Sequence, residues 1–149
     1  RLDRTIDVEM AEDAELLLAE TVVLGRHAMG ETVRSGTWRE TWRIRRGGAL
    51  TFAENVRMAG TMDRQMAGPA VGGGARIVTT VLWFARAAED KLEAVRRTIS
   101  PCRCRIAASA WSGLLVVRAL GTSHEVAQHA AAAVIETLSG RAAPRAWQL

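Results

Sequence analysis

The chain has 149 residues, of which 48% are hydrophobic and 24% charged, and its formal net charge is +4. This composition is that of an ordinary globular domain, and it excludes a disordered tail, a collagen-like chain and a coiled coil. No apolar stretch reaches the roughly 20 residues of a membrane span, and the first residues lack the apolar core of a signal peptide. We therefore expect a single domain over residues 1–149, in the cytoplasm.

The charge is distributed unevenly along the chain. Residues 1–31 carry a net charge of −5 and residues 32–149 one of +9, and all basic residues except Lys91 are arginines. A basic nucleic-acid-binding module is therefore an alternative function. No RRM, KH or zinc-finger spacing accompanies the charge, and 5% aromatic residues provide no evident base-stacking platform. We accordingly expect no nucleic-acid partner.

Alternation of apolar and polar residues predicts strands in the first half of the chain. The predicted strands are residues 2–10, short buried strands within 16–24, and a hairpin of 38–46 with 50–58. A helical start at 11–18 is the alternative for the second segment. Gly47 and Gly48 tolerate the positive φ of a hairpin turn. Residues 60–74 are rich in glycine and are expected to be loop.

Both strand and helix periods occur in the second half. The predicted elements are strands at 77–84, 103–110 and 114–120 and helices at about 87–99 and 122–139. The pattern Thr122–Glu125 resembles a capping box, and Gly140 is a natural helix stop. The order of elements predicts a mainly β to α+β fold with mostly antiparallel sheets and two helices.

Residues with catalytic or metal-binding chemistry are few. Cys102 and Cys104 form a C-x-C pair, for which a shared metal ion and two small buried hydrophobes are the alternatives. His27 lies alone in a glycine-rich loop, and the run Gly72–Gly74 lacks the Lys-Ser/Thr of a phosphate-binding loop. The sequence makes no positive case for an enzyme, and an independent metalloenzyme would need a ligand cluster that the sequence does not display.

A series of short motifs resembles one known family. Gly25–Glu31 reads G-R-H-A-M-G-E, and Trp42–Leu50 contains W-R-I-R-R. Further agreement follows in order at 52–58, 112–118 and 144–147. Over about residues 8–149 this series resembles the C-terminal part of the urease accessory protein UreD family, also called UreH. The resemblance implies a longer parent chain whose N-terminal strands are absent here, so exposed sheet edges predict self-association.

The resemblance also implies a fold and a function. The fold would be mainly β, with a β-helix-like winding of the strands and two helices toward the C-terminus. The function would be that of a non-catalytic scaffold and chaperone for nickel insertion into apo-urease. Its partners would be apo-urease, UreF and the GTPase UreG. No cofactor would be tightly bound, and nickel would be in transit through a water-filled passage.

The motif residues are expected to have structural roles. They are Gly25, Arg26, Gly30, Glu31, Trp42, Arg43, Gly47, Arg118 and Arg145. Arg26 and Glu31 are expected to pair within one loop. The alternative is that Glu31 lines the passage, where a carboxylate would briefly hold a cation. No catalytic, cofactor-binding or resident metal residue is assigned.

Two apolar groups allow either packing or partner binding. Trp38 and Trp42 fit the sheet core better than an interface. The last helix has an apolar stripe of small residues, which would form core or would dock a helix of UreF. The stripe consists of Ala127, Ala130, Ala131, Val134 and Leu138.

Overall fold

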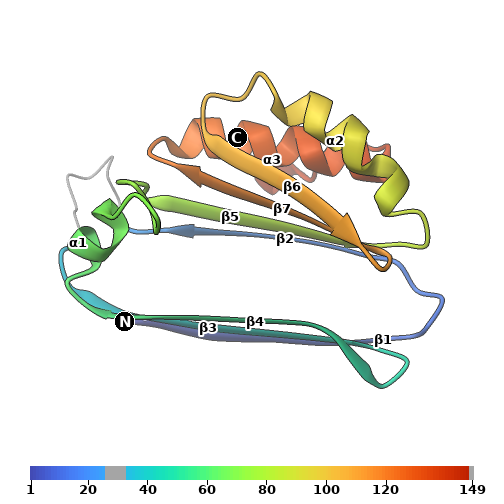
Figure 1. The fold of residues 1–149 in the computed structure, drawn as a ribbon, viewed down its shortest axis with the longest axis horizontal. Coiled ribbons are helices and arrows are strands. Elements are labelled where there is room, and N and C mark those ends of the chain that lie inside the picture. Colours follow the sequence, from blue (N-terminus) through green and yellow to red (C-terminus); the bar gives the residue numbers. More distant parts are fainter. Residues whose placement is uncertain (26–32, 148–149) are drawn as a thin grey trace.

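Two β-sheets lie face to face, and helices cover the outer side of one of them (Figure 1). The computed structural model describes residues 1–25 and 33–147. The strands are β1 (Leu2–Met10), β2 (Leu16–Val23), β3 (Gly36–Arg46), β4 (Ala49–Gly60), β5 (Ile77–Phe84), β6 (Arg105–Trp111) and β7 (Leu114–Gly121). The helices are α1 (Met62–Ala67), α2 (Leu92–Ile99) and α3 (His124–Ser139), with 3-10 turns η2 (Glu89–Lys91) and η3 (Arg145–Trp147).

The three-stranded sheet has the order β1-β3-β4. Its alternating sequence gives one buried face and one exposed face, as period-two strands do. On β3, for example, Trp42 and Ile44 are buried whereas Arg39 and Arg43 are exposed. β1 pairs with β3 in parallel, and β4 pairs with β3 antiparallel. Between β1 and β3 the chain crosses to the other sheet as β2 and returns, which is one turn of a helical winding.

The four-stranded sheet has the order β2-β5-β7-β6 and is antiparallel throughout. β5 and β7 carry apolar residues on both faces, as strands between two packed layers do. Val81 and Leu115 pack toward the helices, whereas Leu82 and Leu114 pack toward the three-stranded sheet. Two core layers therefore lie on the two sides of this sheet.

The helical layer is formed by α2 and α3. Val95 and Ile99 of α2 and the stripe of α3 lie over the four-stranded sheet. The N-cap of α3 is Ser123 instead of the first residue of the predicted capping box, Thr122, and the Ser123 hydroxyl accepts a hydrogen bond from the Val126 N–H. The helix ends at Gly140 in the left-handed conformation, at a φ of 66°. Within the described residues no helix is long and apolar enough to cross a membrane.

The fold class is confirmed, and three details of the predicted elements are corrected. The expected loop 60–74 contains helix α1, because Met62 and Met66 lie one turn apart and are both buried. Residues 16–23 form one strand and no helix begins at 11–18, because every residue of β2 pairs with β5. Regular α-helix begins at Leu92 instead of 87, after the turn η2.

Candidate functional site

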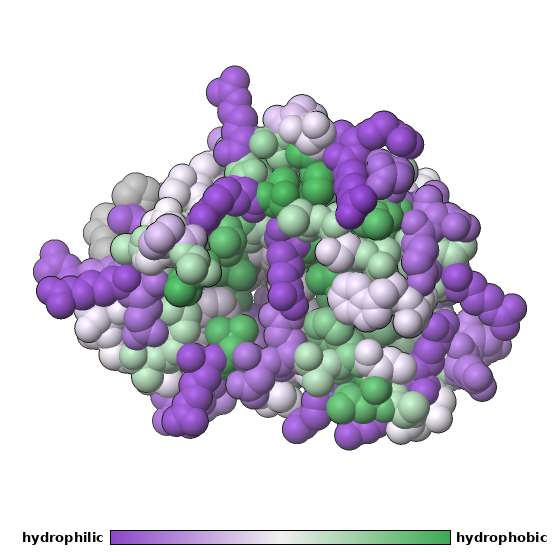
Figure 2. Space-filling model, in the orientation of Figure 1, coloured by the Kyte–Doolittle hydropathy of each residue, from purple (hydrophilic) through white to green (hydrophobic). Residues whose placement is uncertain are grey.

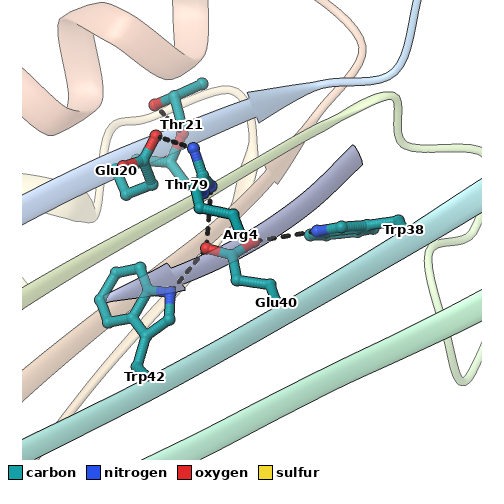
Figure 3. Close-up of polar contacts among 7 residues, drawn as sticks. All are labelled: Arg4, Glu20, Thr21, Trp38, Glu40, Trp42 and Thr79. Carbon is teal, nitrogen blue, oxygen red and sulfur yellow. Dashed lines mark hydrogen bonds and ion pairs between the residues drawn. The ribbon is translucent and has the colours of Figure 1, made fainter. Parts of the chain in front are cut away.

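A cluster of charged side chains lies between the two sheets, within an otherwise apolar layer (Figure 3). Its centre is Glu40 of β3, which is only 4% exposed. Arg4 of β1 donates from Nη2 to Oε1 of Glu40 at 2.8 Å and from Nη1 to Oε1 of Glu20 at 2.8 Å. Because Glu20 belongs to β2, this arginine joins the two sheets.

Strand register explains why these side chains meet. Arg4 and Glu40 are partners in the parallel ladder of β1 and β3. Trp38 and Trp42 lie two residues on either side of Glu40 and therefore share its face. Their indole N–H groups donate to Glu40 at 2.9 Å and 2.6 Å. The carboxylate thus accepts three hydrogen bonds, which a buried charge requires.

The charge of the cluster is not balanced internally. Two carboxylates face the single guanidinium of Arg4, whose Nε is buried without a hydrogen-bond partner in the described part of the chain. Both carboxylates are paired with this one guanidinium, so the three groups carry a formal excess of one negative charge between the sheets.

A small cavity adjoins the cluster. Its volume is about 30 Å³, enough for one or two water molecules. Three carboxylates border it, from Glu20, Glu40 and Glu54. Glu54 of β4 also pairs with Arg118 of β7 at 2.5 Å, which is a second link between the sheets. Charged side chains of β1, β3 and β4 therefore lie between the sheets among apolar ones, and Val22, Val56 and Val78 also line the cavity.

Carboxylate oxygens are ligands for hard and borderline divalent cations. Among the residues that the structure describes, no group of three or more histidine, cysteine, aspartate or glutamate side chains is arranged to hold a metal ion. The cavity carboxylates of the described residues therefore do not form a closed coordination site.

Sequence reasoning assigned no role to Arg4, Glu20, Glu40 or Glu54. The available signal was a charged residue at an apolar position of an alternating strand. Glu40 lies on the same strand face as Trp38 and Trp42, and Arg4 lies on the same face of β1 as the half-buried Leu2 and Ile6. Such a residue is costly to bury unless it is paired, so its presence marks a polar network.

The motif residues are dispersed over the molecule. Gly25 follows β2 with a φ of 93°, and Gly47 has a φ of 55° in the β3–β4 turn. Arg43 pairs with Asp7 on the exposed face of the three-stranded sheet, and Arg145 begins η3. Trp42 and Arg118 belong to the inter-sheet networks described above. Arg26, His27, Gly30 and Glu31 lie outside the described residues.

The apolar stripe of α3 packs inside the chain. Its five residues are all buried, the most exposed being Leu138 at 4%. Val134 and Leu138 belong to the core between α2, α3 and the four-stranded sheet. The stripe is therefore core, and a partner would reach α3 only on the opposite side, where His129 and Glu136 are exposed.

The C-x-C pair lies in the turn before β6. Both thiols are free and partly buried. Burial raises the pKa of the Cys104 thiol, and the nearby Cys102 raises this pKa further. Cys102 packs against the helix-side core, which is consistent with its role as a small hydrophobe. The run Gly72–Gly74 forms a turn in which the Gly72 carbonyl accepts from the Arg105 guanidinium.

Comparison with known proteins identifies the family. The family model described as UreD urease accessory protein matches residues 1–148. A urease accessory protein UreD of Methylobacterium sp. (strain 4-46) is 42% identical over 153 residues, covering 99% of this chain and 54% of that protein. Another, from Beijerinckia indica subsp. indica, is 46% identical over 127 residues, covering 84% of this chain and 47% of that protein.

These matches also define the extent of the likeness. The chain spans about half the length of the curated relatives that it matches. A UreD of Xanthobacter autotrophicus repeats the pattern, at 39% identity over 99% of this chain and 51% of that protein. The chain belongs to the UreD family of urease accessory proteins.

Proposed function

We propose that this chain is a non-catalytic scaffold in the maturation of urease, acting in the cytoplasm. The observation that carries the proposal is the match of the UreD family model to residues 1–148, together with relatives named urease accessory protein UreD. In this role the protein binds apo-urease and UreF, and UreF recruits the GTPase UreG. Nickel is the cargo of the assembly and not a resident cofactor.

The inter-sheet cluster supports a specific part for this chain in nickel transfer. Glu20, Glu40 and Glu54 are among the residues that line a cavity of water-sized volume, and in the described part of the chain Arg4 and Arg118 are the cations paired with them. Negative charge in a site of low dielectric attracts a divalent cation strongly. We propose that these carboxylates line part of the route by which nickel passes, and that the incomplete ligand set lets the ion leave again.

Nickel loading of urease tests this proposal. Urease is produced with the accessory proteins and with the Glu54→Gln variant of this protein, and its nickel is counted by mass spectrometry. Glu54 is partly exposed, so the neutral variant keeps the fold while removing one cavity charge. We expect a severalfold lower nickel content, with unchanged co-purification of the variant with its partners.

Glu93→Gln is the matched control. Glu93 is exposed on α2 and, within the part of the chain that the structure describes, its one ion pair is with Arg96 of the same helix. Its substitution should therefore leave nickel loading unchanged. Equal nickel content for Glu54→Gln and the unmodified protein would overturn the proposed route. Loss of co-purification of the unmodified protein with urease would overturn the scaffold function itself.

A further inference from the structure

The two sheets differ by one strand. β1 lies beneath β2, as the Arg4–Glu20 pair shows, and β4 lies beneath β7, as the Glu54–Arg118 pair shows. The middle strands β3 and β5 pack together through the inter-sheet core. Among the described residues, the edge strand β6 therefore has no strand of the other sheet beneath it.

The uncovered face of β6 borders a hollow. Ile106, Ala108 and Ala110 point into the core beneath the helices, so the alternate residues of β6 point the other way. Those residues include Ala107, Ser109 and Trp111, which line a hollow of about 160 Å³ together with Val116 and Arg118. Trp111 is 47% exposed there. A tryptophan beside an arginine is a frequent energetic anchor of protein interfaces.

The position next to the outer edge of β4 lies beneath β6 and its hollow, because β4 lies beneath β7 and β6 is the neighbour of β7. β4 has 12 residues, and in the described part of the chain its one strand partner is β3. Its other edge therefore presents backbone groups outside the ladder, although the Ala59 carbonyl near its end accepts from the Gln65 side chain. Long free edges are templates for strand addition unless they are protected. β4 contains no proline, and its one irregularity, near Ile44 and Arg45 of β3, lies at the hairpin end. Figure 2 shows the molecule in the orientation of Figure 1, with the sheets edge-on, and on this face hydrophobic residues reach the surface between hydrophilic ones.

The charges on the exposed face of the three-stranded sheet indicate which side chains an added strand would have on that face. Arg57 of β4 lies directly opposite Arg39 of β3. Like charges in a directly opposed pair are unfavourable. Neither arginine forms an ion pair among the described residues, and Asp3, the β1 partner of Arg39, pairs with Arg1. An acidic side chain next to Arg57 on an added strand would relieve this repulsion.

We propose that the free edge of β4 accepts an extended segment of a partner protein as a fourth strand of the sheet. Alternate apolar side chains of the segment fill the hollow beneath Trp111, and the intervening acidic side chains lie on the outer face beside Arg57. Main-chain hydrogen bonds supply affinity, and the two side-chain rows supply specificity. The inference deepens the proposed scaffold function. It rests on that function in one respect, namely that the partner is another protein of urease maturation.

Binding of a synthetic strand tests the proposal. The probe is a ten-residue peptide of alternating valine and glutamate, added to the purified protein, and protection of individual backbone amides is followed by NMR hydrogen exchange. We expect protection along the β4 edge and a change in the environment of Trp111. The same peptide methylated on the amide nitrogens of one edge should not bind, because it cannot complete the ladder.

Substitutions distinguish specific binding at the β4 edge from nonspecific peptide binding. Arg57→Glu should weaken binding of the valine–glutamate peptide about tenfold and favour a valine–lysine peptide instead. Arg97→Glu, the same charge change at an exposed position on α2, should leave binding unchanged. The preference for the lysine peptide is a gain of binding, so a misfolded Arg57→Glu variant would not imitate it.

Several outcomes would overturn the inference. In the peptide assay, these outcomes are no binding, amide protection at the β1 and β2 edges only, or equal binding of the lysine peptide by the unmodified protein. Without peptide, the contradicting outcome is a β4 edge that is already protected by a second copy or by another part of the same chain. The peptide assay uses no urease, so its failure leaves the scaffold function standing. Conversely, intact peptide binding with no association with urease would count against the scaffold function alone.

Discussion

The guanidinium of Arg4 lies 2.8 Å from Oε1 of Glu40, on the parallel strand beside it. The same guanidinium reaches Glu20 in the opposite sheet, also at 2.8 Å. One side chain thus connects β1 to its neighbour β3 within one sheet and connects that sheet to β2 of the other. Because Glu40 is almost fully buried, this contact links the stability of the fold to the charge of the proposed passage.

Substitution of Glu40 should destabilise the fold. Glu40→Ala removes the acceptor of two indole N–H groups and of Arg4, and it leaves these donors buried without that partner. We expect a decrease of about 3–5 kcal/mol in the free energy of unfolding, measured by urea denaturation. The exposed Glu93→Ala should change this free energy by less than about 0.5 kcal/mol. Similar small effects of both substitutions would contradict the role given to the cluster.

The Asp7–Arg43 pair should contribute a pH-dependent increment of stability. Arg43 donates to both carboxylate oxygens of Asp7, at 2.6 Å and 2.9 Å, and this bonding lowers the pKa of Asp7 below its ordinary value of 3.8. A lowered pKa in the folded state means that the increment is present above the unfolded-state pKa. It is lost as the pH falls through the folded-state pKa.

A carboxyl titration followed by NMR checks this pair. Arg43→Gln should raise the pKa of Asp7, and added salt should have the same sense of effect in the unmodified protein. Glu89 is an internal control, because its lowered pKa is due mainly to a hydrogen bond from the Gly113 backbone N–H. An unchanged Asp7 pKa in Arg43→Gln would show that the pair does not persist in solution.

Packing of the helices on the four-stranded sheet should depend on Leu115. This residue is fully buried between β7 and the helical layer. Leu115→Ala should lower the free energy of unfolding by about 2–5 kcal/mol, because a cavity remains where the side chain was. Leu50→Ala, at a position 53% exposed, should cost much less. Chemical denaturation of both variants decides the point, and comparable losses would argue against the layer arrangement.

Free sheet edges should make the isolated chain self-associate. β1 and β2 are edge strands, one in each sheet, and the Arg4–Glu20 pair places them on the same side. Unpaired strand edges of this kind favour pairing between molecules. Static light scattering on the 149-residue chain should give a mass that rises with concentration. A monodisperse monomer over the accessible concentration range would contradict this prediction.

The sequence predicted the elements whose period is unambiguous. Alternation across Trp38–Ile44 placed β3, and the 3.6-residue period placed α3, which begins two residues later than the predicted residue 122. Helix α1 was missed because its six residues lie among glycines, and only the spacing of Met62 and Met66 marked it. Local pattern weighs less than tertiary contact in so short a helix.

The candidate site was harder to predict than the fold. Its residues come from β1, β2, β3 and β4, and their meeting depends on which strands pair and in what register. The parallel pairing of β1 with β3 brings Arg4 to Glu40, 36 residues apart in the chain, and nothing local to either residue encodes that contact. What the sequence did carry was the unusual parity of these charges on otherwise apolar strand faces.

Association with UreF tests the scaffold proposal most directly. The protein is co-expressed with UreF, isolated through a tag on one partner, and analysed by size-exclusion chromatography with light scattering. The account predicts co-elution as a stoichiometric complex, which Arg97→Glu leaves intact. Absence of a complex, both for this chain and for a full-length UreD that contains it, would contradict the scaffold function.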